Sequence, residues 1–151
     1  MDKMELRSWL VAQDLAQENN DRDKIFKIHD HVITEFLLKK FPELCVHTSA
    51  GMQIGIGWVP LMIELCEALE LLKTERPGLS VEFVQVKEKF GGLRCYYNTQ
   101  SASPDTLNII NSIVKVAEEK AWRTCEVCGE PGTINRTGWL QVTCPQHTKG
   151  K

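Results

Sequence analysis

Four residues near the C-terminus constrain this 151-residue chain more than any other feature of its sequence: Cys125, Cys128, Cys144 and His147. Cys125 and Cys128 form a Cys-x-x-Cys pair, and Cys144 and His147 repeat its two-residue gap after an interval of 15 residues. Structural zinc sites use four tetrahedral thiolate or imidazole ligands, commonly supplied by two such pairs. The spacing therefore predicts that these four residues bind one structural Zn²⁺ ion.

Two other interpretations fit the same residues. The cysteines could be reduced buried thiols or a redox pair, but two correctly spaced pairs seldom coincide. A catalytic zinc ion generally keeps an open coordination position, whereas four protein ligands close the shell, and the His-x-Glu sequence of zinc deaminases is missing. We therefore expect a structural ion and no catalysis at the metal.

The residues around the ligands are too few to bury a core of their own. Structural zinc contributes on the order of 10 kcal/mol to modules of this size, more than burial can supply. We predict a zinc-ribbon module at residues 123–151, with a short hairpin between the ligand pairs. Trp139, Leu140 and Val142 are expected to form a strand that covers it.

The rest of the chain, residues 1–122, is predicted to form one α+β globular domain, because 42% hydrophobic and 25% charged residues are ordinary for a folded protein. Hydrophobic residues recur at helical spacing in 5–15, 25–37, 60–72 and 104–122. Alternation in 80–86 and 93–97, on either side of Gly91 and Gly92, predicts an antiparallel hairpin at about 80–98. Residues 43–57 alternate like a strand, although Gly55 and Gly57 indicate turns or a close approach of another backbone.

No targeting or membrane signal is visible in the sequence. No apolar stretch approaches the roughly 20 residues that span a bilayer, and the first residues lack the apolar segment of a signal peptide. We therefore expect a cytoplasmic protein without membrane association. In that compartment Cys45, Cys66 and Cys95 are expected to stay reduced.

The predicted hairpin contains the most distinctive residues outside the metal cluster. Cationic and aromatic side chains alternate there around a glycine turn, and such a surface can contact phosphates while its rings stack on bases. In the other interpretation the charges face water and Phe90 and Tyr97 pack inward. The candidate partner-binding residues are Lys87, Lys89, Phe90, Arg94 and Tyr96.

The sequence resembles an uncharacterised family of bacterial and phage proteins at three places. They are Gly57-Trp58 leading to Leu65-Cys66, the segment Val86-Lys87-Glu88-Lys89-Phe90-Gly91-Gly92-Leu93-Arg94 with Tyr96, and Cys125-Glu126-Val127-Cys128-Gly129-Glu130-Pro131-Gly132. The resemblance covers roughly residues 57–147. It implies only zinc binding and a phage or prophage setting, because no function of the family can be carried over to this chain.

Together these observations favour a binding protein over an enzyme. The sequence has no phosphate-binding glycine loop, nucleophile elbow or paired-carboxylate motif. The phage setting favours an adaptor or inhibitor that binds a host or phage protein. The alternative is a nucleic-acid-binding zinc ribbon, since residues 73–151 carry 11 Lys/Arg against 8 Asp/Glu. Its basic face would comprise Lys87, Lys89, Arg94, Arg123, Arg136, Lys149 and Lys151.

Overall fold

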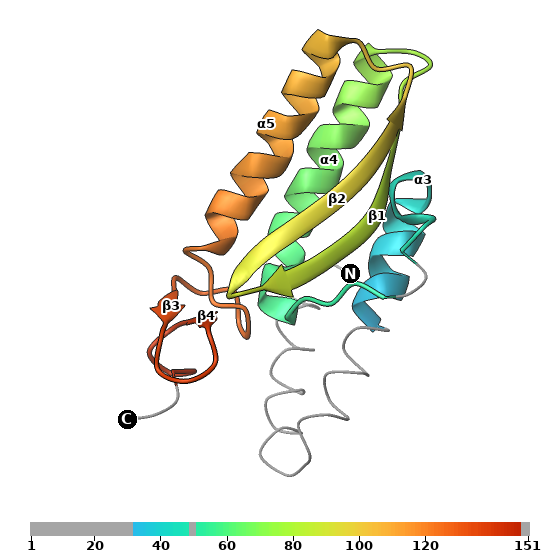
Figure 1. Cartoon of the computed structure of the whole chain (residues 1–151). Helices are drawn as coiled ribbons and strands as arrows, with labels where there is room; N and C mark the ends of the chain where they lie inside the picture. The colour runs from blue at the N-terminus through green and yellow to red at the C-terminus, as the bar shows by residue number, and fades with distance from the viewer. Residues whose placement is uncertain (1–31, 49–50, 149–151) are drawn as a thin grey trace.

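The computed structural model describes residues 32–48 and 51–148, and these form an α+β fold (Figure 1). Residues 32–40 are helical. The elements that follow are α3 (Pro42–Cys45), the 3₁₀ helix η1 (Ile56–Trp58), α4 (Val59–Glu75), β1 (Ser80–Lys89), β2 (Gly92–Gln100), α5 (Pro104–Ala121), β3 (Thr133–Asn135) and β4 (Gln141–Thr143). The predicted α+β class is confirmed, and the helix predicted at 5–15 lies outside the described residues.

Two long helices, α4 and α5, pack side by side behind the β1–β2 hairpin in the view of Figure 1. Pro60 lies in the first turn of α4, where its missing N–H costs nothing. Ser103 caps α5, its hydroxyl oxygen accepting a hydrogen bond from the Thr106 N–H at 3.2 Å. Both helices bury an apolar stripe, which in α5 comprises Ile110, Val114, Ala117 and Ala121.

The hairpin follows its predicted position and contains a β-bulge that the alternation did not reveal. Strands β1 and β2 pair in antiparallel register from Ser80 with Gln100 to Lys89 with Gly92. The register shifts between Phe83 and Gln85, so Val84 is an extra residue of β1. Val84 and Gln85 are both exposed, whereas the next residue, Val86, turns back to the buried face.

Both edges of the hairpin are contacted by other segments. On the β1 side, Gln53 forms a parallel bridge with Lys87: the Gln53 N–H donates to the Val86 carbonyl at 3.0 Å, and the Glu88 N–H donates to the Gln53 carbonyl at 2.7 Å. On the β2 side, the Glu118 carboxylate of α5 accepts a hydrogen bond from the Cys95 backbone. The prediction of a strand within residues 43–57 is wrong, because α3 and η1 lie there. Strand-like pairing occurs only at Gln53 among the described residues of this segment.

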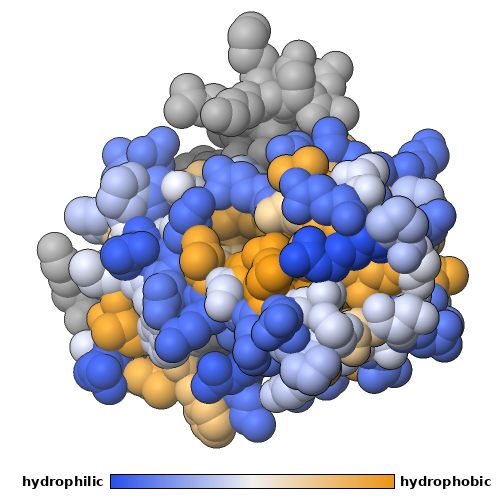
Figure 2. Space-filling model, turned by 90° about the horizontal axis from the view of Figure 1, so that it is seen from above, coloured by the Kyte–Doolittle hydropathy of each residue, from blue (hydrophilic) through white to orange (hydrophobic). Residues whose placement is uncertain are grey.

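The core lies between the hairpin, α4, α5 and the helical segments that precede them. Its largest fully buried side chains include Trp58, Phe83, Met62, Leu69 and Ile110. Seen from the end where α4 stops and α5 begins, hydrophilic residues surround a hollow in which hydrophobic residues are visible (Figure 2). No helix among the described residues is long and apolar enough to cross a membrane.

Candidate metal centre

The four predicted ligands converge on one point in the C-terminal module. Their ligand atoms all lie within 4.8 Å of one another. The sulfurs of Cys128 and Cys144 are 3.7 Å apart, and His147 Nδ1 lies 3.8 Å from the Cys125 sulfur and 3.2 Å from that of Cys144. A tetrahedral ion with Zn–S near 2.3 Å and Zn–N near 2.0 Å would separate two sulfurs by about 3.8 Å, and a sulfur from a nitrogen by about 3.5 Å. The cluster can therefore hold one metal ion.

Short turns place the two ligand pairs. In the first turn, the Gly129 N–H donates to the Cys125 carbonyl at 2.9 Å, with Gly129 at a φ of 83° that favours glycine. In the second, the His147 N–H donates to the Cys144 carbonyl at 3.0 Å. Strand β4 leads directly into Cys144, and its pairing with β3 brings the second turn beside the first.

Backbone N–H groups point at the ligand sulfurs. Burial raises the pKa of Cys128 to about 12, although the Glu130 backbone hydrogen-bonds this sulfur and opposes the rise. At Cys144 burial also raises the pKa, but hydrogen bonds from the His147 ring and from the backbone of His147 and Gln146 outweigh it and lower the pKa to about 7. The backbone donors stabilise thiolate, the form that binds metal, whereas His147 Nδ1 can donate to Cys144 only while no metal is bound.

The first ligand turn is bonded to the segment that precedes α4. The Gly57 N–H donates to the Glu126 carbonyl at 2.8 Å, and the Trp58 indole N–H donates to the Thr124 carbonyl at 2.9 Å. A Cβ atom on Gly57 would lie 2.1 Å from the Cys125 carbonyl oxygen, and one on Gly55 would lie 2.3 Å from the carbonyl oxygen of Glu126. The close backbone approach predicted at these glycines is confirmed.

The candidate partner-binding residues gather on the hairpin. Arg94 and Tyr96 lie on the exposed face of β2, and Lys87 of β1 lies opposite Arg94, with its Nζ 5.9 Å from the centre of the Tyr96 ring. Lys89 and Phe90 lie at the turn. Phe90 is 69% exposed, so its expected inward packing is wrong, whereas Tyr97 packs against the core as the same interpretation expected.

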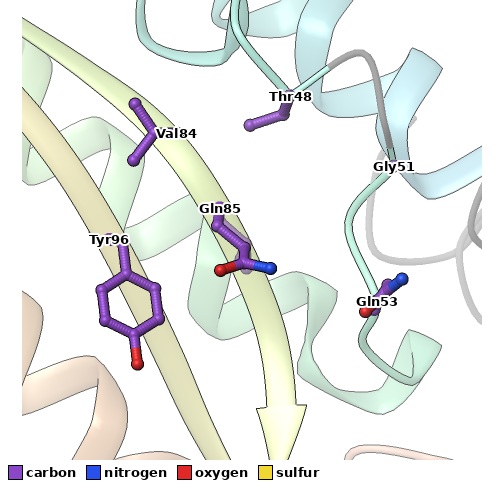
Figure 3. Close-up of a pocket in the computed structure, with 7 residues that line it drawn as sticks. Thr48, Gly51, Gln53, Val84, Gln85 and Tyr96 are labelled. Atoms are coloured by element: carbon purple, nitrogen blue, oxygen red, sulfur yellow. The ribbon is translucent and has the colours of Figure 1, made fainter.

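A shallow pocket of about 390 Å³ adjoins the same sheet face (Figure 3). One wall consists of Val84, Gln85 and Tyr96 from the hairpin, and the other consists of Thr48, Gly51 and Gln53. This pocket could not be predicted from the sequence, because its walls come from segments distant in the chain and one wall depends on the bulge.

Trp139 does not cover the metal module as expected. It is 83% exposed in the connection between β3 and β4, and the buried residue of that pair is Val142. Two further exposed aromatic residues, Phe90 and Trp122, lie at neighbouring elements. The hydrophobic character of Trp139 was the misleading signal, since a turn beside Gly138 leaves its ring outside.

The other three cysteines, Cys45, Cys66 and Cys95, are buried and free of disulfides. A hydrogen bond with Cys45, together with burial, raises the pKa of Cys66 far above its ordinary value, and burial likewise raises that of Cys95. Both thiols therefore stay protonated at neutral pH and are poor nucleophiles. The comparisons give no assignment for the site: the chain matches no protein-family model, no curated protein and no solved structure.

Proposed function

We propose that this chain is a non-enzymatic binding protein whose C-terminal segment is a zinc ribbon held by one structural Zn²⁺ ion. The observation that carries the proposal is the convergence of Cys125, Cys128, Cys144 and His147, with all four ligand atoms within 4.8 Å of one another. Three thiolates and one imidazole favour zinc over magnesium or calcium, which prefer oxygen ligands. Four protein ligands would complete the tetrahedral shell and leave no position for a substrate.

The pocket on the sheet face supports a role other than catalysis. Among the described residues its lining contains the amides of Gln53 and Gln85, the Thr48 hydroxyl and the Tyr96 ring, but no carboxylate, histidine, cysteine or lysine. General acid–base and nucleophilic catalysis at neutral pH depend mostly on those groups. The pocket is thus suited to contact with a partner.

Two classes of partner fit this binding protein. The resemblance to phage proteins supports a host or phage protein as partner, with this chain as an adaptor or inhibitor. The cationic face of the hairpin supports the alternative, which is nucleic acid.

Metal analysis of the purified full chain tests the proposed zinc ribbon. We expect one zinc ion per chain by elemental analysis, and cobalt substitution should give the absorption of a tetrahedral site with sulfur ligands. Cys128→Ser and His147→Ala should each lose the ion. Cys66→Ala, which removes a thiol from the core, should retain it and serves as the matched control.

Full zinc content in Cys128→Ser, or a metal-free wild type that keeps a folded C-terminal module, would contradict the proposal. Steady turnover of a substrate that stops on replacement of zinc would contradict the non-enzymatic role.

A further inference from the structure

We propose that the exposed face of the β1–β2 hairpin, continued by the aromatic residues beside the metal module, binds single-stranded nucleic acid. This inference rests on the proposed function in one respect, that the chain is a zinc-stabilised binding protein. It names the partner and the surface. We call this surface the hairpin strip and define it by Lys87, Lys89, Phe90, Arg94 and Tyr96.

The cations of the hairpin strip are available to an anion. Lys87 and Arg94 lie directly opposite each other on the exposed face, and Lys89 lies two residues beyond Lys87 on the same face of β1. Within the described residues none of the three forms a salt bridge. Three positive charges on adjacent strands suit the evenly spaced phosphates of a nucleic-acid backbone.

Three carboxylates lie near the hairpin strip: two are held by other groups, and the third, Glu118, also interacts electrostatically with Arg94. Glu82 lies 2.7 Å from His47 Nε2, and the Glu88 carboxylate accepts the Gly91 N–H at 2.6 Å. Glu118, the carboxylate that faces Arg94 from α5, accepts a hydrogen bond from the Cys95 backbone. Hydrogen bonds leave these carboxylates charged, so the attraction for an anion comes from the head groups of Lys87, Lys89 and Arg94 on the exposed face and not from a large net charge of the region.

Aromatic rings accompany the cations. Tyr96 is 45% exposed, and the Nζ of Lys87 lies over its ring. Phe90 is 69% exposed, and the Nζ of Lys89 lies 5.7 Å from its ring centre. Figure 3 shows the Tyr96 ring on the sheet face at the side of the pocket. Exposed rings stack on bases of any sequence, provided that the bases are not already stacked in a duplex. This combination favours a single strand.

The strip continues onto the metal module at the hairpin turn. A Cβ on Gly91 would lie 2.5 Å from the Ile134 side chain, and one on Gly92 would lie 2.7 Å from the Trp122 ring. The turn therefore packs against β3 and the end of α5, and Figure 1 shows these elements next to it. Trp122 and Trp139, which are 40% and 83% exposed, lie in these neighbouring segments and can extend the stacking surface.

The experiment is a fluorescence-anisotropy titration of the zinc-loaded full chain. The probes are labelled oligo-dT and oligo-U of about 12 nucleotides, a length within the range of known single-strand sites. A duplex of equal length is the comparison. We expect the single strands to bind more tightly than the duplex, with affinity falling as salt rises from about 50 to about 200 mM.

Variants assign the binding to the hairpin strip. The double substitution Lys87→Gln with Arg94→Gln should weaken single-strand binding by about tenfold or more and lower the salt slope by roughly two. Tyr96→Ala should weaken single-strand binding about 5- to 100-fold, whereas Tyr96→Phe, which keeps the ring, should bind as the wild type does. Lys115→Gln removes an exposed cation of α5 and should leave the affinity unchanged.

Failure of this inference and failure of the proposed function give different results. Zinc content and the far-UV circular dichroism of each variant are measured in parallel, so that lost binding with one zinc and a normal spectrum locates the effect at the surface. A zinc-loaded wild type that binds neither oligonucleotide would overturn the nucleic-acid site and leave the zinc ribbon standing. An unchanged oligonucleotide affinity in the Lys87/Arg94 variant would also overturn the site. The same conclusion would follow if the wild type bound no oligonucleotide but bound a protein that the Lys87/Arg94 variant did not bind.

Discussion

The helix–hairpin core and the C-terminal metal module are built on different stabilising principles. The core buries a continuous apolar cluster that includes Trp58, Phe83, Leu69 and Ile110. In residues 123–148 the buried apolar side chains are Val142 and the ligands Cys125 and Cys144. Hydrophobic burial stabilises the first region, whereas the second buries few apolar side chains and brings together four residues that could hold a metal ion. The contacts of Gly57 and Trp58 with the first ligand turn join the two regions.

The largest effect should follow removal of a ligand. Cys128→Ser is expected to abolish zinc binding, whose contribution is on the order of 10 kcal/mol in small zinc modules, and to unfold residues 123–148. Hydrogen exchange should accelerate throughout the module and also in residues 55–58, because they lose their partners in the ligand turn. Slow exchange should persist in α4, α5 and the hairpin, and loss of protection there would show that the core also requires the metal.

A cavity in the core should have the next largest effect on stability. It should destabilise the core and leave zinc binding unchanged, which is the opposite of the result expected for loss of a ligand. Phe83→Ala removes a fully buried ring and should lower the free energy of unfolding by about 3–5 kcal/mol in a denaturant titration. Below the unfolding transition the variant should still bind one zinc per chain. Zinc loss from the folded variant would mean that the module has no stability apart from core packing.

The junction can be tested with one added methyl group. Gly57→Ala places a Cβ where the Cys125 carbonyl already lies, and backbone atoms on both sides limit relaxation, so we expect a loss of about 1–3 kcal/mol. Transfer of zinc to a chromophoric chelator should also be faster. A Cβ on Gly138 would meet open space, but the residue has a φ of 82°. Gly138→Ala should therefore lower the free energy of unfolding by roughly 1 kcal/mol without changing the rate of zinc transfer.

The smallest effect should come from the ion pair between the two long helices. Lys120 Nζ lies 2.8 Å from the Glu64 carboxylate, but both side chains are substantially exposed. A double-mutant cycle with Lys120→Ala and Glu64→Ala should give a coupling energy of about 0.2–1 kcal/mol. A coupling well above that range would show that charge, as well as apolar packing, holds the core together.

Features determined by neighbouring residues could be predicted from the sequence. The positions of α4 and α5 follow from Pro60, Ser103 and the spacing of their apolar residues, and the hairpin follows from alternation around Gly91. The four candidate metal ligands were predicted from two short spacings, and the structure brings all four together.

Features that depend on contacts between distant segments could not be predicted. Trp58 and its partner Thr124 are separated by 66 residues, and neither residue indicates the other. The bridge between Gln53 and Lys87 involves a single residue, too short for any periodic pattern. The exposed position of Trp139 likewise depends on the turn geometry between two strands of three residues each.

The bulge at Val84 adds one residue to β1 without changing which side chains the strand buries. If Val84 were absent, Val81, Phe83 and Val86 would follow strict alternation and still face the helices. Val84 therefore adds nothing to the pattern that buries the strand, but it bends the strand and supplies part of the pocket wall. We therefore expect deletion of Val84 to leave the buried face of β1 intact while changing the wall of the pocket.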